Sequence, residues 1–495
     1  MKRFTLLLLF FAGLPGLFTL TAAAQEQDTL ALTLDRALEL ASLQSPELMN
    51  SRRALQRSET QMINSKADLK PRLGLSFTPF SYDRSNTFMD YNSSYNLTET
   101  MSSNIALTLS QKVKFTGGTL NFSEGIDWRD YMNETDQKSS STFSNRLSIS
   151  YEQPIFKYNE VKMNSRQQEL DLETSRLSYA LQVIQLEQTV TNAFYGVYRS
   201  FKSVETAEDA YNNQLETYTL TKNKVESKLL AESELLQQEI TLANRQDALA
   251  SARDSYQRMK DDFKKMLGLS LDIDLSVIPP VAITPIEIDA KEAIRHALDQ
   301  RLQLKQSEIS LERLRLQLIQ VRATDKFSGN LSFSLGFSGN DSKIEQVFNK
   351  QSHNEGVRVT LSIPIWDWGI RKNNIRNAEL NIEESEINLD EARKEVEIRI
   401  RELCRNLPRY LNKIALSEKS IENAEITYKI NYEKYMNGSL SSMMFKDYQD
   451  QLTSARQSYI DAIIDYRMQL LEIKIYTLWD FEKNESIVPY SLLQL

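Results

Sequence analysis

Residues that could act as catalysts or as metal ligands are few in this chain of 495 residues. It has two histidines, His296 and His353, which are far apart, and a single cysteine, Cys404. The sequence shows no metal-site spacing, no Cys–His or Ser–His nucleophile pair and no glycine-rich phosphate loop. It therefore predicts a protein that is not an enzyme and that uses no cofactor and no metal. We expect both histidines to be structural, and Cys404 to be a small filler residue in a helix.

The elements that would position functional residues repeat within the chain. Two stretches align without a gap at an offset of 210 residues. The matched positions include Pro154 with Pro364, Arg166 with Arg376, and Lys228 with Gly438. Each copy begins with Pro-Ile-aromatic and follows a helical pattern to a turn 74 residues after the proline. Such a helix is roughly 100 Å long, which an ordinary globular core cannot use, so the repeat predicts a rod or a tube.

The N-terminus has the features of a secretory signal peptide, which we place at residues 1–24. Lys2 and Arg3 precede an apolar run, and Ala22-Ala23-Ala24 offers small residues for cleavage before Gln25. No cysteine stands at the cleavage site, so no lipid anchor is expected there. After residue 25 the sequence has no run of about 18 apolar residues, so it predicts no transmembrane helix. A membrane crossing would then require a closed β-barrel, because backbone polar groups in lipid must be paired.

Breaks in the periodic pattern divide the mature chain into two structural repeats. The predicted units are a first repeat at 25–275, a proline-containing linker at 276–288, a second repeat at 289–483 and an irregular tail at 484–495. In each repeat we expect a shorter helix, two strands, a long helix, a turn and a return helix. Pro46 should break the first helix near Ser45, and Pro408 should kink the long helix of the second repeat.

Alternation of apolar and polar residues marks the strands. It is clearest from Leu73 to Phe77 and from Leu331 to Phe337, and return strands precede both long helices. The connection between paired strands is short in the second repeat, at 340–354, but much longer in the first. Gly117-Gly118 is a hairpin signal, so we predict an extra hairpin at about 103–128. The Ser- and Asn-rich stretches beside it, Asn92–Ser94 and Ser139–Ser141, are interpreted as long surface loops.

Apolar residues recur every seven positions along the second long helix. The heptad series is Ile375, Ile382, Leu389, Val396 and Leu403. This spacing is typical of a packing seam between helices. Ile387 and Ile398 form a second apolar stripe, which predicts that each helix contacts two neighbours, like a stave in a barrel. An ordinary two-stranded coiled coil is the alternative.

The order of elements resembles the TolC-type outer-membrane efflux proteins over residues 30–483. Pro364-Ile365-Trp366-Asp367-Trp368-Gly369 is similar to the family's Pro-Leu-Phe-Asp-x-Gly exit from its barrel, and Tyr435-Met436-Asn437-Gly438 to its Tyr-x-x-Gly helical turn. The resemblance implies a mainly α-helical homotrimer in the outer membrane. Four strands per chain would form a twelve-stranded membrane β-barrel, continuous with a long α-helical barrel in the periplasm. The resemblance also implies the exit duct of a tripartite efflux system, fed by an inner-membrane pump through a periplasmic adaptor protein.

A gate at the periplasmic helix tips is a further implication of the resemblance. By position, Tyr435 and Asp447 match constriction residues of the family. Leu440 stands where the family has an arginine and Met444 where it has its first aspartate, so a more apolar closure that includes Met443 is an open alternative. Three-fold symmetry would bring three Asp447 side chains together, which could bind or select a cation. The plain alternatives are a solvated charge at Asp447 and a packing residue at Tyr435.

The hairpin tips are also where the adaptor would dock. In the first repeat Lys228 replaces the family's usual glycine, whereas the second repeat keeps Gly438. Ser233 could cap the return helix, and Glu234 is the counterpart of an acidic family position. We assign Lys228, Glu234 and Gly438 to adaptor docking. The alternative is that they are solvated turn residues.

Other functions remain open from the sequence. The duct of a type I protein-secretion system would look the same, because the pump chooses the cargo. A periplasmic adaptor usually has one long hairpin, and a structural coiled-coil protein needs no barrel strands. The formal net charge of −8 argues against a nucleic-acid partner.

Overall fold

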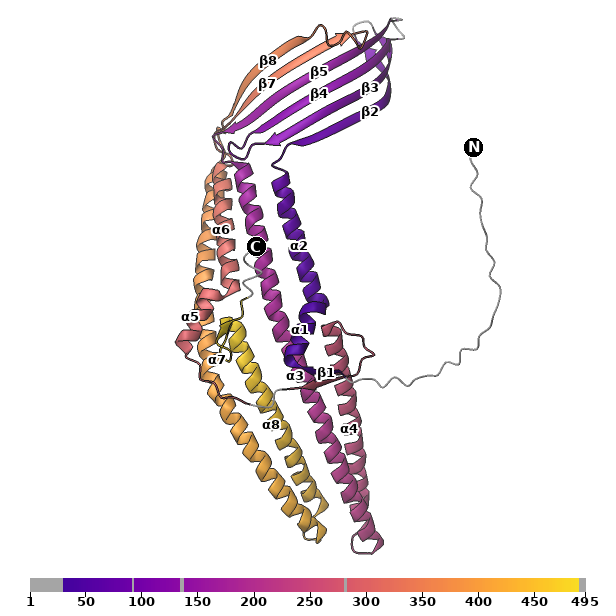
Figure 1. The fold of residues 1–495 in the computed structure, drawn as a ribbon, viewed down its shortest axis with the longest axis vertical. Coiled ribbons are helices and arrows are strands. Elements are labelled where there is room, and N and C mark those ends of the chain that lie inside the picture. Colours follow the sequence, from indigo (N-terminus) through magenta and orange to yellow (C-terminus); the bar gives the residue numbers. More distant parts are fainter. Residues whose placement is uncertain (1–29, 91–92, 134–137, 280–282, 489–495) are drawn as a thin grey trace, which may run out of the picture.

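The structure is a computed structural model, and it describes residues 30–90, 93–133, 138–279 and 283–488. The predicted signal peptide lies outside them. Figure 1 shows a long molecule with a tilted sheet at one end, short elements near the middle, and two helical hairpins at the other end. None of the helices in the described ranges combines the length and the apolar character that a membrane span needs.

The described residues form eight helices, which pair off by length between the two predicted repeats. They are α1 (Leu34–Gln44), α2 (Pro46–Ala67), α3 (Glu160–Glu226), α4 (Glu232–Leu267), α5 (Ala290–Gln300), α6 (Leu302–Ala323), α7 (Ile370–Met436) and α8 (Ser442–Thr477). The lengths are 11, 22, 67 and 36 residues in the first repeat, and the same values recur in the same order in the second. The two long helices therefore lie where the offset of 210 places them.

Local signals explain where helices begin and end. The helical pattern is interrupted at Ser45, and Pro46 is the first residue of α2. Proline is favoured at the first position of a helix because its missing N–H would have no partner there. Asn159 caps α3 by accepting a hydrogen bond from the Lys162 N–H at 2.9 Å. α7 continues as a helix through Pro408.

The large sheet has six strands, not the four per chain that the resemblance implied. They are β2 (Arg72–Met89), β3 (Ser94–Lys112), β4 (Thr119–Asn133), β5 (Lys138–Ile155), β7 (Ser328–Asp341) and β8 (Ser352–Ser362). The order is β2-β3-β4-β5-β7-β8, and every neighbouring pair is antiparallel. The hairpin predicted at about 103–128 corresponds to β3 and β4, which are paired inside the sheet. Ser139–Ser141 belong to β5 and not to a surface loop, and His353 belongs to β8.

The two faces of this sheet differ because side chains alternate along each strand. The register places these apolar residues side by side on one face: Leu109, Phe122, Ile149 and Leu335. Their neighbours on the opposite face are Thr108, Ser123, Ser148 and Gly336. The apolar face is open in the single chain, with Leu73, Leu75 and Phe77 of β2 exposed by 65, 69 and 63 %. An exposed apolar surface of this extent marks a contact with lipid or protein.

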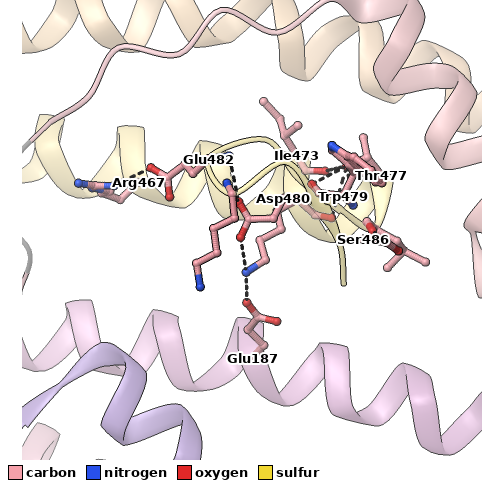
Figure 2. Close-up of polar contacts among 11 residues, drawn as sticks. Glu187, Arg467, Ile473, Thr477, Trp479, Asp480, Glu482 and Ser486 are labelled. Atoms are coloured by element: carbon pink, nitrogen blue, oxygen red, sulfur yellow. Dashed lines mark hydrogen bonds and ion pairs between the residues drawn. The ribbon is translucent and has the colours of Figure 1, made fainter. Parts of the chain in front are cut away.

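Short strands form a belt around the middle of the helices. β1 (Leu30–Thr33) pairs in parallel with β6 (Leu275–Ile278), and β9 (Trp479–Asp480) pairs with β10 (Glu485–Ser486) near the start of the predicted irregular tail. Lys474 of α8 forms ion pairs with Glu187 of α3 at 2.7 Å and with Asp480 at 3.1 Å. In Figure 2, dashed lines join Glu187 and Asp480 to the ammonium group that lies between them, and the Arg467–Glu482 pair lies beside Asp480. The belt is thus tied to the helices by charged groups.

Three residues of the heptad seam of α7 are buried and two, Ile375 and Ile382, are half-buried, whereas the second stripe is exposed. Leu389, Val396 and Leu403 pack in clusters that include residues of α6, α5 and α8, respectively. Ile387 and Ile398 are 60 and 67 % exposed. Within the described chain, one apolar stripe of the long helix therefore remains uncovered.

Candidate functional site at the helix tips

The α3–α4 and α7–α8 hairpins end in turns of the same backbone form. Lys228 in the first turn and Gly438 in the second both have positive φ, of 60° and 75°. In each turn the following N–H donates to a helix carbonyl five residues back, at 2.8 and 2.9 Å. Lys228 thus adopts a conformation that favours glycine, the residue found at the matching position of the other tip.

Tyr435 lies between the two hairpins and is only 5 % exposed. Its ring stacks on Phe445 of α8, with the centroids 4.9 Å apart and the planes 6° from parallel. Its hydroxyl is 2.6 Å from Thr221 Oγ1 of α3. Because Thr221 already donates its only hydroxyl proton to the Thr217 carbonyl at 2.8 Å, Tyr435 donates and Thr221 accepts. Burial raises the pKa of Tyr435, which keeps this proton in place.

Lys224 of α3 covers the carboxyl end of α7. Its ammonium group donates to the Met436 carbonyl at 2.6 Å and lies 5.7 Å from the centre of the Tyr435 ring. The last carbonyls of a helix lack intrahelical partners and carry partial negative charge, so an ammonium group there is stabilising. Lys224 and Thr221 therefore fasten the first hairpin to the end of α7.

A second set of polar contacts joins the hairpins further from the tips. The Tyr432 hydroxyl donates to Glu216 at 2.7 Å, and this hydrogen bond to a carboxylate raises the pKa of Tyr432 to about 12. Arg456 of α8 pairs with Asp209 of α3 at 2.9 Å and with Glu425 of α7 at 3.1 Å. Charged groups as well as packing therefore hold α3, α7 and α8 together.

Polar contacts also join α4 to α8. Ser442 donates to Glu234, and Arg245 forms an ion pair with Asp450. Lys446 contacts the same carboxylate at 3.1 Å. Burial opposes the ionisation of Asp450, but the hydrogen bonds from Arg245 and Lys446 lower its pKa overall. Asp450 is therefore charged in neutral solution, and the contact between the two return helices persists there.

Buried positions between the helices become polar toward the tips. These polar seam residues are Gln214, Thr217 and Thr221 of α3, Gln238 and Thr241 of α4, Asn431 of α7, and Ser442 and Gln449 of α8, all at most 8 % exposed. Further from the tip the buried seam of α3 is apolar, with Leu177, Ile184 and Val190. When a polar seam parts, its groups exchange protein hydrogen bonds for water, so the tips separate at a lower cost than the apolar middle.

The predicted gate residues differ in their surroundings. Tyr435 is buried, whereas Asp447 is exposed on α8. Met444 and Met443 are 52 and 76 % exposed, and Leu440 is half-buried, so none of the three is a core residue of the single chain. The structure does not bring Asp447 into the cluster around Tyr435.

The predicted docking residues lie at or near the two turns. Lys228 and Gly438 are exposed at their tips, and Glu234 is half-buried, where it accepts the hydrogen bond from Ser442.

Sequence analysis missed the partners of Tyr435, which are Thr221, Lys224 and Phe445. Thr221 is 214 residues away from Tyr435, so no local pattern connects the two. One signal was available: Gln214 and Thr221 are seven residues apart, which puts polar side chains at seam positions. Polar residues on a heptad seam point to a buried polar contact with another helix.

The belt contains a second candidate site, a cavity of about 520 Å³ between α1, α3, α8 and the linker. Five of its charged side chains form ion pairs: Lys474 pairs with Glu187 and Asp480, and Arg467 pairs with Glu482. In the part of the chain that the structure describes, no group of three or more His, Cys, Asp and Glu side chains could hold a metal ion. His296 stacks on Trp479 with the ring centroids 4.1 Å apart. The helix tips therefore remain the better candidate for a functional site.

Comparisons with known proteins agree with one another. A family model described as "Outer membrane efflux protein" matches residues 37–269 and 293–479. The chain is 21 % identical over 356 residues to the cation efflux system protein CusC of Escherichia coli O6:H1, covering 69 % of this chain and 73 % of that protein. The Campylobacter jejuni CmeC outer membrane channel superposes with a TM-score of 0.68 at 15 % identity, over 91 % of this chain and 88 % of that one. The open state of the Neisseria gonorrhoeae MtrE outer membrane channel superposes with a TM-score of 0.63 at 13 % identity, over 90 and 88 %.

Proposed function

This chain belongs to the outer membrane efflux protein family, and from that premise we propose that it serves as the exit duct of a tripartite efflux system. The protein is an outer-membrane efflux channel that extends into the periplasm. In the proposed role it receives substrates from an inner-membrane pump through a periplasmic adaptor protein. One observation carries the proposal: a sheet with an exposed apolar face continues directly into helices of 67 residues (Figure 1).

Three copies would complete the wall of the duct. β2 and β8 are the outer strands of the described sheet, and each leaves one edge unpaired there. Pairing β2 of one copy with β8 of the next closes a barrel with its apolar face toward lipid. The exposed stripe of Ile387 and Ile398 gains a neighbour when the helices close into a ring. Forming a homotrimer therefore pairs the open sheet edges and covers the exposed helix face.

The equal helix lengths support an internal duplication. On this proposal residues 25–275 and 289–483 are two copies of one unit, joined by the linker at 276–288, with a tail at 484–495. The four helices of one copy have the same lengths as those of the other and follow in the same order along the chain. The β3–β4 hairpin is the main difference between the copies.

We assign the closed state of a gate to the contacts of Tyr435. Thr221 and Lys224 tie the end of α7 to α3, and the polar seam lets the tips part once these contacts break. In a trimer, Asp447, Leu440 and Met444 of three copies would face one another at the tips. A ring of three Asp447 carboxylates favours cations. This agrees with the name of CusC as a protein of a cation efflux system.

We assign adaptor docking to the exposed outer surface of the tips, around Lys228, Glu234 and Gly438. Apolar side chains are exposed beside Lys228: Leu229, Leu236 and Ile240 are open by 73, 55 and 58 %. Leu236 and Ile240 lie four residues apart and so share one face of α4. An exposed apolar stripe beside charged turn residues fits a helical groove that accepts another protein.

Single-channel conductance in planar bilayers tests the duct and its gate together. Thr221→Val combined with Lys224→Met removes both contacts that hold the end of α7. Lys222→Met is the control, because Lys222 is exposed on the same helix. We expect small, intermittent currents from the wild type and the control, and larger, longer-lived currents from the double variant. Equal currents in all three would remove these contacts from the gate, and a properly inserted protein that never conducts would contradict the duct.

A further inference from the structure

We propose that β3 and β4 are full members of the pore wall, so that three copies close an 18-stranded barrel whose outlet admits bulky hydrophilic cargo. This inference rests on the proposed trimeric duct and adds to it the width of the outlet. Three copies of the six-stranded sheet give eighteen strands, whereas the four strands per chain implied by the resemblance would give twelve. The extra pair of strands decides what size of solute can leave.

β3 and β4 are hydrogen-bonded to their neighbours along most of their length. β4 pairs with β3 over residues 98–112 and with β5 over residues 138–152. β3 pairs with β2 from Arg72 to Met89, with one register shift. A hairpin that lay across the lumen or outside the wall would leave β2 and β5 to pair with each other. In this sheet they are separated by the two strands, which therefore contribute to its width.

The faces of β3 and β4 are in phase with those of the other strands. On the apolar face they carry Leu107, Leu109, Phe122 and Ile126. On the opposite face they carry Thr108, Ser110, Asn121 and Ser123. A plug in an aqueous lumen would meet water on both sides and would gain nothing from an apolar face. The pattern therefore places both strands in the wall, with the hydroxyl and amide groups toward the lumen.

Glu124 is a charged exception on the apolar face, and its surroundings account for it. Its carboxylate accepts a hydrogen bond from the Asn145 side chain of β5 at 2.5 Å. Asn145 is 1 % exposed, and Gln351 donates to it at 3.2 Å from the segment before β8. The polar groups are thus paired across neighbouring strands, and they do not interrupt the sheet.

The base of the β3–β4 hairpin is fastened to the helices on both sides of it. The Gln111 side chain donates to the Leu69 carbonyl just after α2, at 2.8 Å. On the other side, the Asn159 side chain at the start of α3 donates to the Lys114 carbonyl at 2.8 Å. The hairpin therefore bridges the gap between α2 and α3 at the point where the sheet meets the helices.

The width of six strands matches the width of the helices that continue from them. Strands lie about 4.8 Å apart and tilt by about 40° in membrane barrels, so each occupies about 6.3 Å of circumference. Six strands then span about 38 Å, and four would span about 25 Å. The four helices nearest the sheet, α2, α3, α6 and α7, pack in sequence at about 8–10 Å, or about 32–40 Å in total. Six strands per copy thus continue the helical tube at the same bore.

The consequence for cargo is a larger size limit. The radius of a barrel grows roughly in proportion to its strand number, so eighteen strands give about 1.5 times the radius of twelve and about 2.25 times the cross-section. The lumen face carries mainly Ser, Thr, Asn and charged residues. The outlet therefore suits bulky, hydrated solutes.

One-sided polymer exclusion in planar bilayers separates the outlet from the tips. Polyethylene glycols that enter a pore lower its conductance, and polymers on the extracellular side report on the sheet end. The test variant removes residues 90–137 and joins Met89 to Lys138 through an Asn-Gly turn, which leaves β2 antiparallel to β5. We expect the radius of the largest polymer admitted from the extracellular side to fall about 1.5-fold, with an unchanged limit from the periplasmic side. Equal extracellular limits in the two proteins would overturn the proposal. A wild type that conducts under no condition would overturn the duct itself.

Thiol labelling tests the same proposal if the deletion variant does not fold. In a Cys404→Ser background, Thr108→Cys and Leu109→Cys probe the two faces of β3, and Ser148→Cys and Ile149→Cys are the matched pair on β5. A membrane-impermeant maleimide should modify the proteins with Thr108→Cys and Ser148→Cys, and a lipid-soluble one the other two. If both positions of β3 react with the impermeant reagent while β5 keeps its alternation, β3 is not part of the wall.

Discussion

The tip of the α7–α8 hairpin is packed more tightly than the tip of the α3–α4 hairpin, although their backbones are alike. In the second hairpin, Tyr435 and Phe445 are both buried and stacked. At the same places in the first hairpin, 210 positions earlier, stand Val225 and Leu235, which are only half-buried. Both turns nevertheless share a positive φ and the same bond to a helix carbonyl. Equal backbone geometry therefore does not bring equal side-chain anchoring.

The difference suits two separate tasks on the proposed assignments. A gate residue has to be held in one state and released in another, and Tyr435 is held by a stack, a hydrogen bond and a nearby ammonium group. A docking surface has to stay open to a partner, and Leu229, Leu236 and Ile240 are exposed near the other tip. The anchored gate residue thus belongs to the second hairpin, whereas the exposed apolar part of the proposed docking surface belongs to the first.

Removing the aromatic anchor should have the largest effect on this comparison. Phe445→Ala deletes a side chain that is 1 % exposed and should destabilise the second tip by about 3–5 kcal/mol. Leu235→Ala, at the matching position of the first hairpin, should cost clearly less because Leu235 is half-buried. Amide hydrogen exchange of residues 431–449 and 221–239 measures local opening in the assembled protein. Equal losses of protection would show that the tips are anchored alike.

The direction of the Tyr435–Thr221 hydrogen bond predicts the next effect. Thr221→Val leaves the buried Tyr435 hydroxyl without its acceptor, which should cost about 1–3 kcal/mol. Tyr435→Phe should cost less than about 1 kcal/mol, because Thr221 still donates to the Thr217 carbonyl. Thr219→Val is a matched control, since Thr219 is exposed and makes the same bond to its own helix. Hydrogen exchange at the tips ranks the three variants, and the reverse order for the first two would mean that Thr221 is the donor.

Substitutions at the two turn residues, Gly438 and Lys228, should have smaller effects on the stability of the tips, and the two effects should be of opposite sign. A Cβ added at Gly438 meets no atom within 4 Å, so the cost of Gly438→Ala is conformational, about 1 kcal/mol. Lys228→Gly removes the same strain, and it should stabilise the first tip by less than about 1 kcal/mol because glycine loses more entropy on folding. Local exchange rates at the two turns measure both changes. A destabilising Lys228→Gly would reveal a contact of the Lys228 side chain that outweighs its backbone strain.

Sequence patterns predicted the helical part of the fold because its signals are long. A series of four heptads marks α7, Pro46 marks the start of α2, and matching turns at Lys228 and Gly438 mark the ends of the two hairpins. Strands were predicted less completely. Ser139–Ser141 of β5 lie where the strand is polar on both faces, so their composition resembles that of a loop.

The contacts at the tips were beyond sequence patterns for a different reason. Tyr435 could be located by its turn, but its burial depends on Phe445 across that turn and on Thr221 in the other hairpin. Lys224 reaches the end of α7 from a helix more than two hundred residues earlier in the chain. Local periodicity shows that a helix has a seam, and tertiary packing decides which helix meets it.

The smallest expected effect is on the contact of Tyr432, which links α7 to α3 through the charged Glu216. Tyr435 makes the corresponding link through the neutral Thr221. The hydrogen bond to Glu216 raises the pKa of Tyr432 from its ordinary value near 10 to about 12. Between these two values the folded state keeps a proton that the unfolded state loses. The contact therefore contributes fully to stability below about pH 10, and that contribution is lost as the pH rises through about 12.

Glu216→Gln tests this link, because it keeps an acceptor for Tyr432 but removes the negative charge. The pKa of Tyr432 should then fall toward its ordinary value. The control is Glu433→Gln, which changes an exposed residue next to Tyr432 on α7 and should leave this pKa unchanged. Tyrosinate absorbance, recorded as the difference between each variant and the wild type, measures the shift. An unchanged titration in Glu216→Gln would mean that burial holds the proton. In that case the connection of α3 to α7 near the tips would depend mainly on the neutral contacts of Tyr435 and on Lys224.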